Sequence, residues 1–248
     1  MFKIENICPG YWRIRDGVTE GDWFVDCYLV EGTELALLID AGVSGRDLAG
    51  AVRKLTDKPV TLALLHIHSD HTAAARQFAN VYVSRLERTT TQTEEGLAEK
   101  LESYQELTDG MVFELGGRTL EAIHVPGHTQ GSFVLLCEED RVLLTSDTIG
   151  SGPIWVQLPE SSTSAEFAPW LKRLEARVRN LPDLALLVGH SHQANTALTA
   201  QYITDVRIAA EHAAAGDRGE SADAVSPFGG RMLSQGQMQC YVFKEPAN

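Results

Sequence analysis

Three histidines and an aspartate fall within six residues of the sequence, in the run His66-Ile67-His68-Ser69-Asp70-His71. Neutral imidazole and carboxylate groups are the ligands that Zn²⁺ and related divalent cations prefer. Because these side chains alternate within a short loop, they can diverge toward two neighbouring positions, which permits a site for two cations. A helix start capped by Ser69 or Asp70 would also explain the cluster, but it would predict no matching ligands elsewhere.

Matching residues occur at three later positions. His128 lies in the glycine-containing turn Pro126-Gly127-His128-Thr129, Asp147 follows the apolar run 142–144, and His190 follows the apolar run 184–188. Alone, a polar residue at a strand end is usually only a turn residue, but these three occur together with the six-residue cluster. The sequence therefore predicts a two-metal site built from seven residues: His66, His68, Asp70, His71, His128, Asp147 and His190.

The order and spacing of these residues resemble those of the metallo-β-lactamase superfamily, and the resemblance spans most of the chain. It rests on His66-x-His68-x-Asp70-His71, Gly127-His128-Thr129, Asp147 and Gly189-His190. The resemblance implies that a first metal ion is bound by His66, His68 and His128. It implies that a second is bound by Asp70, His71 and His190, with Asp147 bridging the two.

The resemblance also implies roles beyond direct metal binding. Asp40, in Leu38-Ile39-Asp40-Ala41-Gly42, is expected to lie behind the ligands rather than on a metal, with a simple turn role as the alternative. Two zinc ions are the expected cofactors, although iron or manganese suits the same ligands. The implied reaction is hydrolysis by a metal-bridging hydroxide, with Asp70 as the catalytic proton shuttle.

The bond that is cut is less well defined, since the superfamily includes hydrolases of thioesters, lactones, β-lactams and phosphoesters. True β-lactamases generally lack the bridging aspartate, which this chain has at Asp147. The hydroxyacylglutathione hydrolase group usually adds a C-terminal helical region with clustered basic residues. After Thr199 this chain has only Arg207, Arg218, Arg231 and Lys244, which are dispersed. Lactonases usually present a tyrosine shortly after the bridging aspartate, and the run 148–155 contains none.

We therefore expect a hydrolase of an uncharged or weakly anionic ester, thioester or lactone, similar to the hydroxyacylglutathione hydrolases or lactonases. Trp155 and His192 are candidate substrate-pocket residues, and Trp23, Phe24 and Phe228 could add apolar surface, although each could equally be ordinary packing. Residues 216–230 are turn-rich and would form either a lid over the site or a surface loop.

Two other classes of function remain open. A redox enzyme resembling the persulfide dioxygenases would use one iron held by two histidines and an aspartate. A phosphodiesterase or nuclease would need a basic surface, which Arg85, Arg88 and their neighbours could supply only as a local patch.

The elements that must position these residues are strands that end at the candidate ligands. Apolar runs predict strands at 11–15, 24–30, 35–39, 60–65, 81–83, 111–115, 119–125, 132–137, 141–144, 184–188 and 238–243. Helices are predicted at 44–55, 72–78, 85–104, 165–180 and 199–215. Two successive β-then-α halves indicate an α+β fold with two sheets packed face to face and helices outside, and the resemblance implies a four-layer αβ/βα sandwich.

Composition limits the partners. A chain of 248 residues, 44% of them hydrophobic, suits a single domain over residues 1–248. A formal net charge of -13 disfavours nucleic acid and anionic membranes, which leaves a small-molecule substrate. Because neither a long apolar stretch nor a signal sequence is evident, a cytoplasmic location is expected. The four cysteines are dispersed without a paired motif, and Cys27 and Cys137, in apolar runs, are predicted to be buried structural thiols. The sequence leaves the oligomeric state open.

Overall fold

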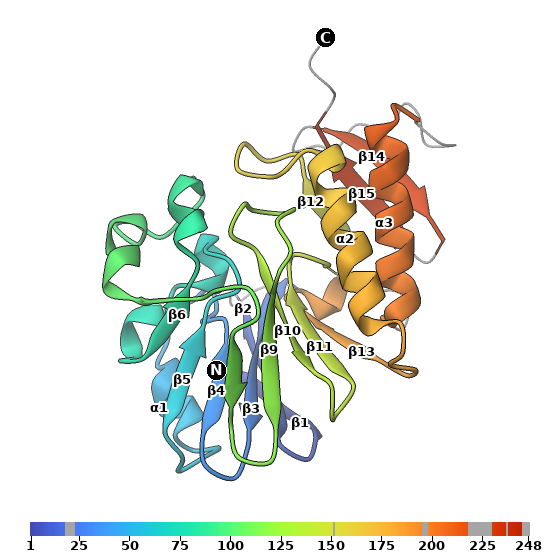
Figure 1. Cartoon of the computed structure of the whole chain (residues 1–248). Coiled ribbons are helices and arrows are strands. Elements are labelled where there is room, and N and C mark those ends of the chain that lie inside the picture. Colours follow the sequence, from blue (N-terminus) through green and yellow to red (C-terminus); the bar gives the residue numbers. More distant parts are fainter. Residues whose placement is uncertain (18–22, 151, 195–197, 218–229, 237, 245–248) are drawn as a thin grey trace.

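The computed structural model describes residues 1–17, 23–150, 152–194, 198–217, 230–236 and 238–244, and two large sheets form its centre (Figure 1). The first sheet has the order β1 (Lys3–Cys8), β2 (Tyr11–Gly17), β3 (Phe24–Glu31), β4 (Ala36–Ile39), β5 (Val60–Ala63), β6 (Val81–Val83) and β7 (Gln105–Glu106). The second has the order β13 (Ala185–Val188), β11 (Val142–Ser146), β10 (Phe133–Cys137), β9 (Thr119–His124) and β8 (Val112–Glu114). A small third sheet joins β12 (Pro153–Val156), β15 (Met238–Phe243) and β14 (Arg231–Gln235).

Successive side chains of the central strands enter different cores, because side chains alternate between the two faces of a sheet. In β4, Leu37 packs between the two large sheets, whereas Leu38 packs on the outer face of the first sheet. In β10, Leu135 packs between the sheets and Leu136 on the outer face of the second. Both faces of these strands are buried, which explains why the sequence shows continuous apolar runs rather than alternation.

Helices close the two outer faces. The helices α2 (Ser164–Val178) and α3 (Ala200–Ala214) contact each other, and their apolar side chains share a core with the second and third sheets (Figure 1). The short α1 (Leu48–Val52) packs on the outer face of the first sheet. The layers therefore run helix, sheet, sheet, helix, and the predicted α+β four-layer sandwich is confirmed. That residues 1–248 form one domain stays a prediction.

The strands that carry the candidate ligands end at one edge of the sandwich. The parallel pair β4 and β5 leads to Asp40 and His66, and the parallel pair β11 and β13 leads to Asp147 and His190. Two backbone hydrogen bonds join the sheets close to this edge, from Phe133 N to Leu65 O and from Asp26 N to Gly189 O, at 2.9 and 2.7 Å. The ligand-bearing loops are thus fixed by both sheets.

Several predicted helices are shorter or absent. Residues 85–104 form two 3₁₀ helices, η3 (Arg85–Thr89) and η4 (Ala98–Ser103), instead of one solvated helix. Thr90 ends η3 in extended backbone, and the fully buried carboxyl of Glu87 accepts hydrogen bonds from the hydroxyls of Thr90 and Thr129. The hydrogen bond from Thr129 to the buried Glu87 fixes residues 85–90 against the loop that contains His128, whereas a solvated helix would leave Glu87 exposed.

Other differences are local. The helix expected at 44–55 is reduced to α1 with Asp47 as its cap, because the Ser44 hydroxyl donates to Asp16 instead. The helix expected at 72–78 is a single 3₁₀ turn, η2 (Ala75–Gln77). Strands β1, β7, β12 and β14 were not predicted, and residues 218–229 of the suggested lid lie outside the described residues. Over the described part of the chain, every helix is too short or too polar to cross a membrane.

The inter-sheet core provides the first test. Leu37 is fully buried between the sheets, whereas Leu35, two residues earlier, is 37% exposed. We expect Leu37→Ala to lower the free energy of unfolding by about 2–5 kcal/mol, because it leaves a cavity in the layer that aligns the two sheets. Urea unfolding measures this difference, with Leu35→Ala as the matched control at well under about 1 kcal/mol. Equal losses for the two variants would contradict the assigned layer order.

Candidate metal centre and substrate pocket

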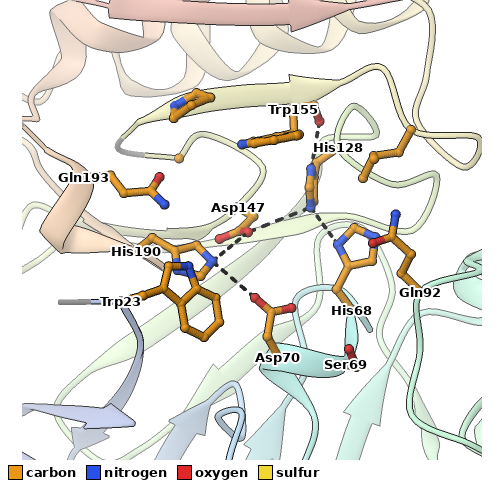
Figure 2. A pocket seen from close by; sticks show the side chains of 13 residues that line it. Trp23, His68, Ser69, Asp70, Gln92, His128, Asp147, Trp155, His190 and Gln193 are labelled. Atoms are coloured by element: carbon orange, nitrogen blue, oxygen red, sulfur yellow. Dashed lines mark hydrogen bonds and ion pairs between the residues drawn. The ribbon is translucent and has the colours of Figure 1, made fainter. Parts of the chain in front are cut away.

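The loops at the common edge bring all seven predicted ligands together, most of them visible in Figure 2. His66, His68 and His128 form one group and Asp70, His71 and His190 another, and within each group the candidate ligand atoms lie within 4.8 Å of one another. Asp147 lies between the groups. Its Oδ2 atom is 3.2 Å from His190 Nε2, 3.5 Å from His71 Nε2 and 3.9 Å from His128 Nε2.

Hydrogen bonds fix the ring orientation of the first group. His128 Nδ1 lies 2.8 Å from the carbonyl oxygen of Trp155, and His68 Nε2 lies 3.0 Å from Glu160 Oε1. Because a carbonyl or carboxylate oxygen accepts hydrogen bonds, the proton of each neutral ring belongs on the nitrogen that faces it. The remaining nitrogens, His128 Nε2 and His68 Nδ1, then carry lone pairs and face each other at 2.8 Å.

The second group is oriented in the same way. His71 Nδ1 lies 2.9 Å from Asp40 Oδ2, and His190 Nδ1 lies 3.0 Å from the carbonyl oxygen of Phe24. Their Nε2 atoms face each other at 3.4 Å. Asp40 thus lies against the Nδ1 side of the His71 ring, and its predicted role behind the ligands stays a prediction. Its Oδ1 also accepts from Leu65 N at 3.1 Å, and its Oδ2 accepts from the Ser146 hydroxyl at 2.6 Å.

Two buried polar atoms at the centre lack a hydrogen-bond partner among the described residues: His66 Nε2 and Asp147 Oδ1. A buried polar atom without a partner is destabilising, so such an atom calls for a bound ion or water. Here the atoms are an imidazole nitrogen and a carboxylate oxygen, both ordinary ligands of divalent cations. The donor set around them thus fits a cation in each group.

Protonation differs between the two groups of histidines. Burial and the neighbouring imidazoles hold the pKa of His66 well below its usual range and lower the pKa of His128 to about 4. Burial opposes the charged forms of His71 and His190 as well. In these two the carboxylates of Asp147 and Asp70 outweigh it, raising the pKa of His71 well above its usual range and that of His190 to about 10. The second group therefore holds protons that a cation would have to displace.

The backbone is tightly constrained around these side chains. Asp40, directly after β4, has a φ of 60°, and Ser146, the last residue of β11, has a φ of 47°. Both lie in the left-handed region that residues with a Cβ rarely adopt. At Gly189 a Cβ would overlap Asp147 Oδ1 and lie 2.7 Å from His71 Cε1. The glycine before His190 is thus required because two candidate ligands pack against it.

A pocket of about 460 Å³ opens onto the cluster (Figure 2). It is lined by Trp23, His68, Ser69, Asp70, Gln92, His128, Asp147, Gly150, Pro153, Trp155, Leu158, His190 and Gln193. The predicted pocket residue Trp155 is in this lining. His192 packs on the Phe24 ring instead, with centroids 4.5 Å apart, and Gln193 lines the pocket in its place. Phe228 lies outside the described residues.

Sequence reasoning missed the groups that hold the ligands from behind. Glu160 is 4% exposed and contacts His68, and its other oxygen accepts from the Thr91 hydroxyl at 3.1 Å. Ser146 joins Asp40 to the cluster. Ser146 could have been noticed as the neighbour of Asp147, but the loop around Glu160 carries no periodicity or motif that marks it.

The basic residues considered for nucleic-acid binding are neutralised. Arg85 pairs with Glu106 at 2.6 Å and Arg88 pairs with Glu102 at 3.2 Å. Among the dispersed basic residues near the C-terminus, Arg207 pairs with Glu175 at 2.7 Å. The segment 85–88 therefore offers paired guanidinium groups and not an unopposed basic patch.

The contact of Glu160 with His68 can be tested by Glu160→Gln. We expect this variant to bind zinc about 10–100-fold more weakly, because the charged acceptor that fixes the His68 ring is lost. Zinc affinity measured by competition with a chromophoric chelator reports this change. Glu99→Gln, which alters an exposed carboxylate, is the matched control. If both variants keep the wild-type affinity, Glu160 does not hold the ligand.

The protonation asymmetry predicts a pH effect on cation binding. His190, with a pKa of about 10, is protonated near neutral pH, and a cation that binds it must expel that proton. Zinc affinity should therefore rise as the pH increases from about 7 toward 10, with net proton release. Calorimetry of the metal-free chain in buffers of different ionisation enthalpy counts these protons. Binding without proton release near pH 7 would contradict the assignment.

Comparison with known proteins agrees with this geometry. A family model described as the metallo-beta-lactamase superfamily matches residues 21–190. The acyl-coenzyme A thioesterase MBLAC2 of Gallus gallus is 24% identical over 223 residues, covering 76% of this chain and 80% of the relative. An atrochrysone carboxyl ACP thioesterase of Claviceps purpurea is 31% identical over 155 residues, covering 59% of this chain but only 47% of its own length.

Solved structures show the same fold. A metallo-beta-lactamase superfamily protein of Sulfolobus tokodaii superposes with a TM-score of 0.62 at 22% identity, covering 90% of this chain and 92% of that one. A metallo-beta-lactamase from Pontibacter korlensis gives a TM-score of 0.60 at 17% identity, covering 82% and 96%. The family match over most of the chain, the shared fold and the converging histidines lead to one conclusion: this chain belongs to the metallo-beta-lactamase superfamily.

Proposed function

We propose that the protein is a dinuclear metal-dependent hydrolase of acyl thioesters. The observation that carries this proposal is the orientation of the cluster. In four histidines one ring nitrogen faces a hydrogen-bond acceptor and the other nitrogen faces inward. His66 Nε2 has no hydrogen-bond partner among the described residues. One oxygen of Asp147 lies close to histidines of both groups.

In this proposal His66, His68 and His128 would hold one cation and Asp70, His71 and His190 the other, with Asp147 as a ligand that both groups could share. Zinc is the expected cation, and such a pair acidifies water and polarises a carbonyl group when bound. The chain's own groups set the geometry. Asp40, Glu160 and two backbone carbonyls keep the rings in the tautomer that points a lone pair inward.

Asp70 is the residue best placed to move a proton. Its side chain is 27% exposed, it lines the pocket, and its Oδ2 atom lies 3.4 Å from His190 Nε2. Burial would raise the pKa of Asp70, but the charges of His71 and His190 lower it, so its carboxylate is ionised and can accept a proton. We assign it to carry a proton toward the departing thiolate.

The choice of a thioester rests on relatives and pocket together. The matched relatives include an acyl-coenzyme A thioesterase and ACP thioesterases. Among the described lining residues no lysine or arginine is present, so the pocket itself gives no cationic side chain to a phosphodiester. Esters and lactones present the same carbonyl chemistry and are the nearest alternative substrates.

The redox alternative is less well supported by the site. A mononuclear iron enzyme needs two histidines and one aspartate, whereas here a second set of inward-facing nitrogens completes another group. The nuclease alternative loses its basic patch, because Arg85 and Arg88 are paired with glutamates.

The proposal is tested by metal analysis together with rates on a panel of thioester, lactone, phosphodiester and β-lactam substrates. We expect about two zinc ions per chain, with thioester turnover that is abolished by chelation and restored by zinc. His68→Ala and Asp147→Asn should each lower kcat/KM at least about a hundredfold, since each removes a proposed ligand.

Matched controls are His212→Ala, which changes a half-buried residue of α3, and Asp57→Asn, which changes an exposed residue; neither belongs to the cluster, and both variants should retain full activity. One iron per chain without hydrolysis of any substrate would overturn the proposal and favour the redox alternative. Wild-type activity and metal content in Asp147→Asn would exclude the bridging role.

A further inference from the structure

We propose that Trp155 and Leu158 form the wall that selects the acyl group, so that the preferred substrate is a thioester of an uncharged, apolar acyl chain. This inference rests on the proposed function and adds the class of acyl group to it. Trp155 lies in β12 and lines the pocket over the cluster (Figure 2), and Leu158, in the loop that follows β12, lines the same pocket.

The wall is held rigidly against the reacting groups. The carbonyl of Trp155 accepts from His128 Nδ1 at 2.8 Å, and the Ser161 hydroxyl donates to the carbonyl of His128 at 2.7 Å. Glu160, in the same segment, contacts His68. The residues 155–161 therefore place two ligand histidines and the pocket wall together. A wall fixed before substrate arrives binds an apolar group without the entropic cost of ordering a loop.

The chemistry of the lining favours an apolar acyl chain. Within the described lining, every charged or titratable residue belongs to the metal cluster. The other side chains are neutral: Trp23, Pro153, Trp155 and Leu158 are apolar, and Ser69, Gln92 and Gln193 offer hydrogen bonds. A carboxylate on an acyl chain lying along Trp155 and Leu158 would lose hydration without gaining a lysine or arginine from this lining.

The two halves of a thioester make different demands on such a pocket. A saturated acyl chain presents only apolar surface and gains by covering an indole and a leucine side chain. A thiol carrier that bears several amide groups needs several hydrogen-bond partners, whereas the Leu158 side chain has no polar atom and the Trp155 side chain has only its indole N–H. We therefore assign the acyl half to this wall.

The test measures kcat/KM for a series of straight-chain acyl thioesters from acetyl to hexanoyl on one thiol. For the wild type we expect a rise of about fourfold per added methylene, the value for full burial of a CH₂ group. Trp155→Ala and Leu158→Ala should each reduce this increment to less than about twofold. An acyl chain ending in a carboxylate, matched in length, should react at least about tenfold more slowly.

Control variants separate this role from a general loss of structure. Trp170→Ala removes an indole of α2 that packs, partly buried, against the core and should keep the wild-type increment. Metal content is measured in each variant, and Trp155→Ala should match the wild type because its backbone carbonyl, which holds His128, is retained. An increment unchanged in Trp155→Ala would overturn the inference.

Failure of the proposed function gives a different result. If no thioester is hydrolysed, the proposed reaction is wrong. Calorimetry with non-hydrolysable thioethers of the same acyl series still decides whether Trp155 binds the chain. Affinity that rises with chain length in the wild type and not in Trp155→Ala supports the wall. Turnover or affinity that instead follows the length of the thiol half, with the acyl half fixed, would overturn it.

Discussion

The geometry of the site depends on the hydrogen bonds that the carboxylate of Asp40 accepts. This carboxylate lies at the end of β4 in the first sheet and accepts hydrogen bonds from Leu65 N, from the Ser146 hydroxyl and from His71 Nδ1. Ser146 ends β11 in the second sheet. One buried group therefore ties the ends of strands from both sheets to a ligand ring. The left-handed backbone of Asp40 and Ser146 is the conformational cost, offset by these hydrogen bonds.

The arrangement of imidazoles and carboxylates at the cluster explains how an acidic protein can hold an electrophilic centre. The formal net charge is -13, yet the cluster contains five imidazoles, and among the described lining residues only Asp70 and Asp147 present carboxylates to the pocket. Other nearby carboxylates, such as Asp40 and Glu160, are occupied by hydrogen bonds behind the rings. In the proposed site they would orient ligands without filling a ligand position, and divalent charge bound there would be only partly neutralised.

Sequence was informative where chemistry is local. His66 to His71 form a dense motif, and Gly127-His128 and Gly189-His190 mark turns at strand ends, so the cluster could be predicted without a structure. Gly189 is required because Asp147 and His71 pack against it, a reason invisible in sequence. Glu160 and Glu87 were missed because their roles arise from burial against distant segments. The same burial replaced the helix expected at 85–104 by two 3₁₀ helices, since tertiary contacts override local propensity.

Different segments of the fold provide the candidate ligands and the pocket wall. The candidate ligands come from the ends of β-strands and the turns beside them, which both sheets hold in place. The pocket wall comes from β12, which pairs with β15 in the small third sheet, and from the loop that follows it. This segment contacts His128 and His68 from outside the cluster. Changing the side chain of Trp155 leaves its carbonyl, and thus the His128 ring, in place. If the proposed function holds, such a scaffold could alter which acyl group it accepts without rebuilding the metal centre, because the atoms of Trp155 that would select the acyl group and the atom that orients His128 are separate.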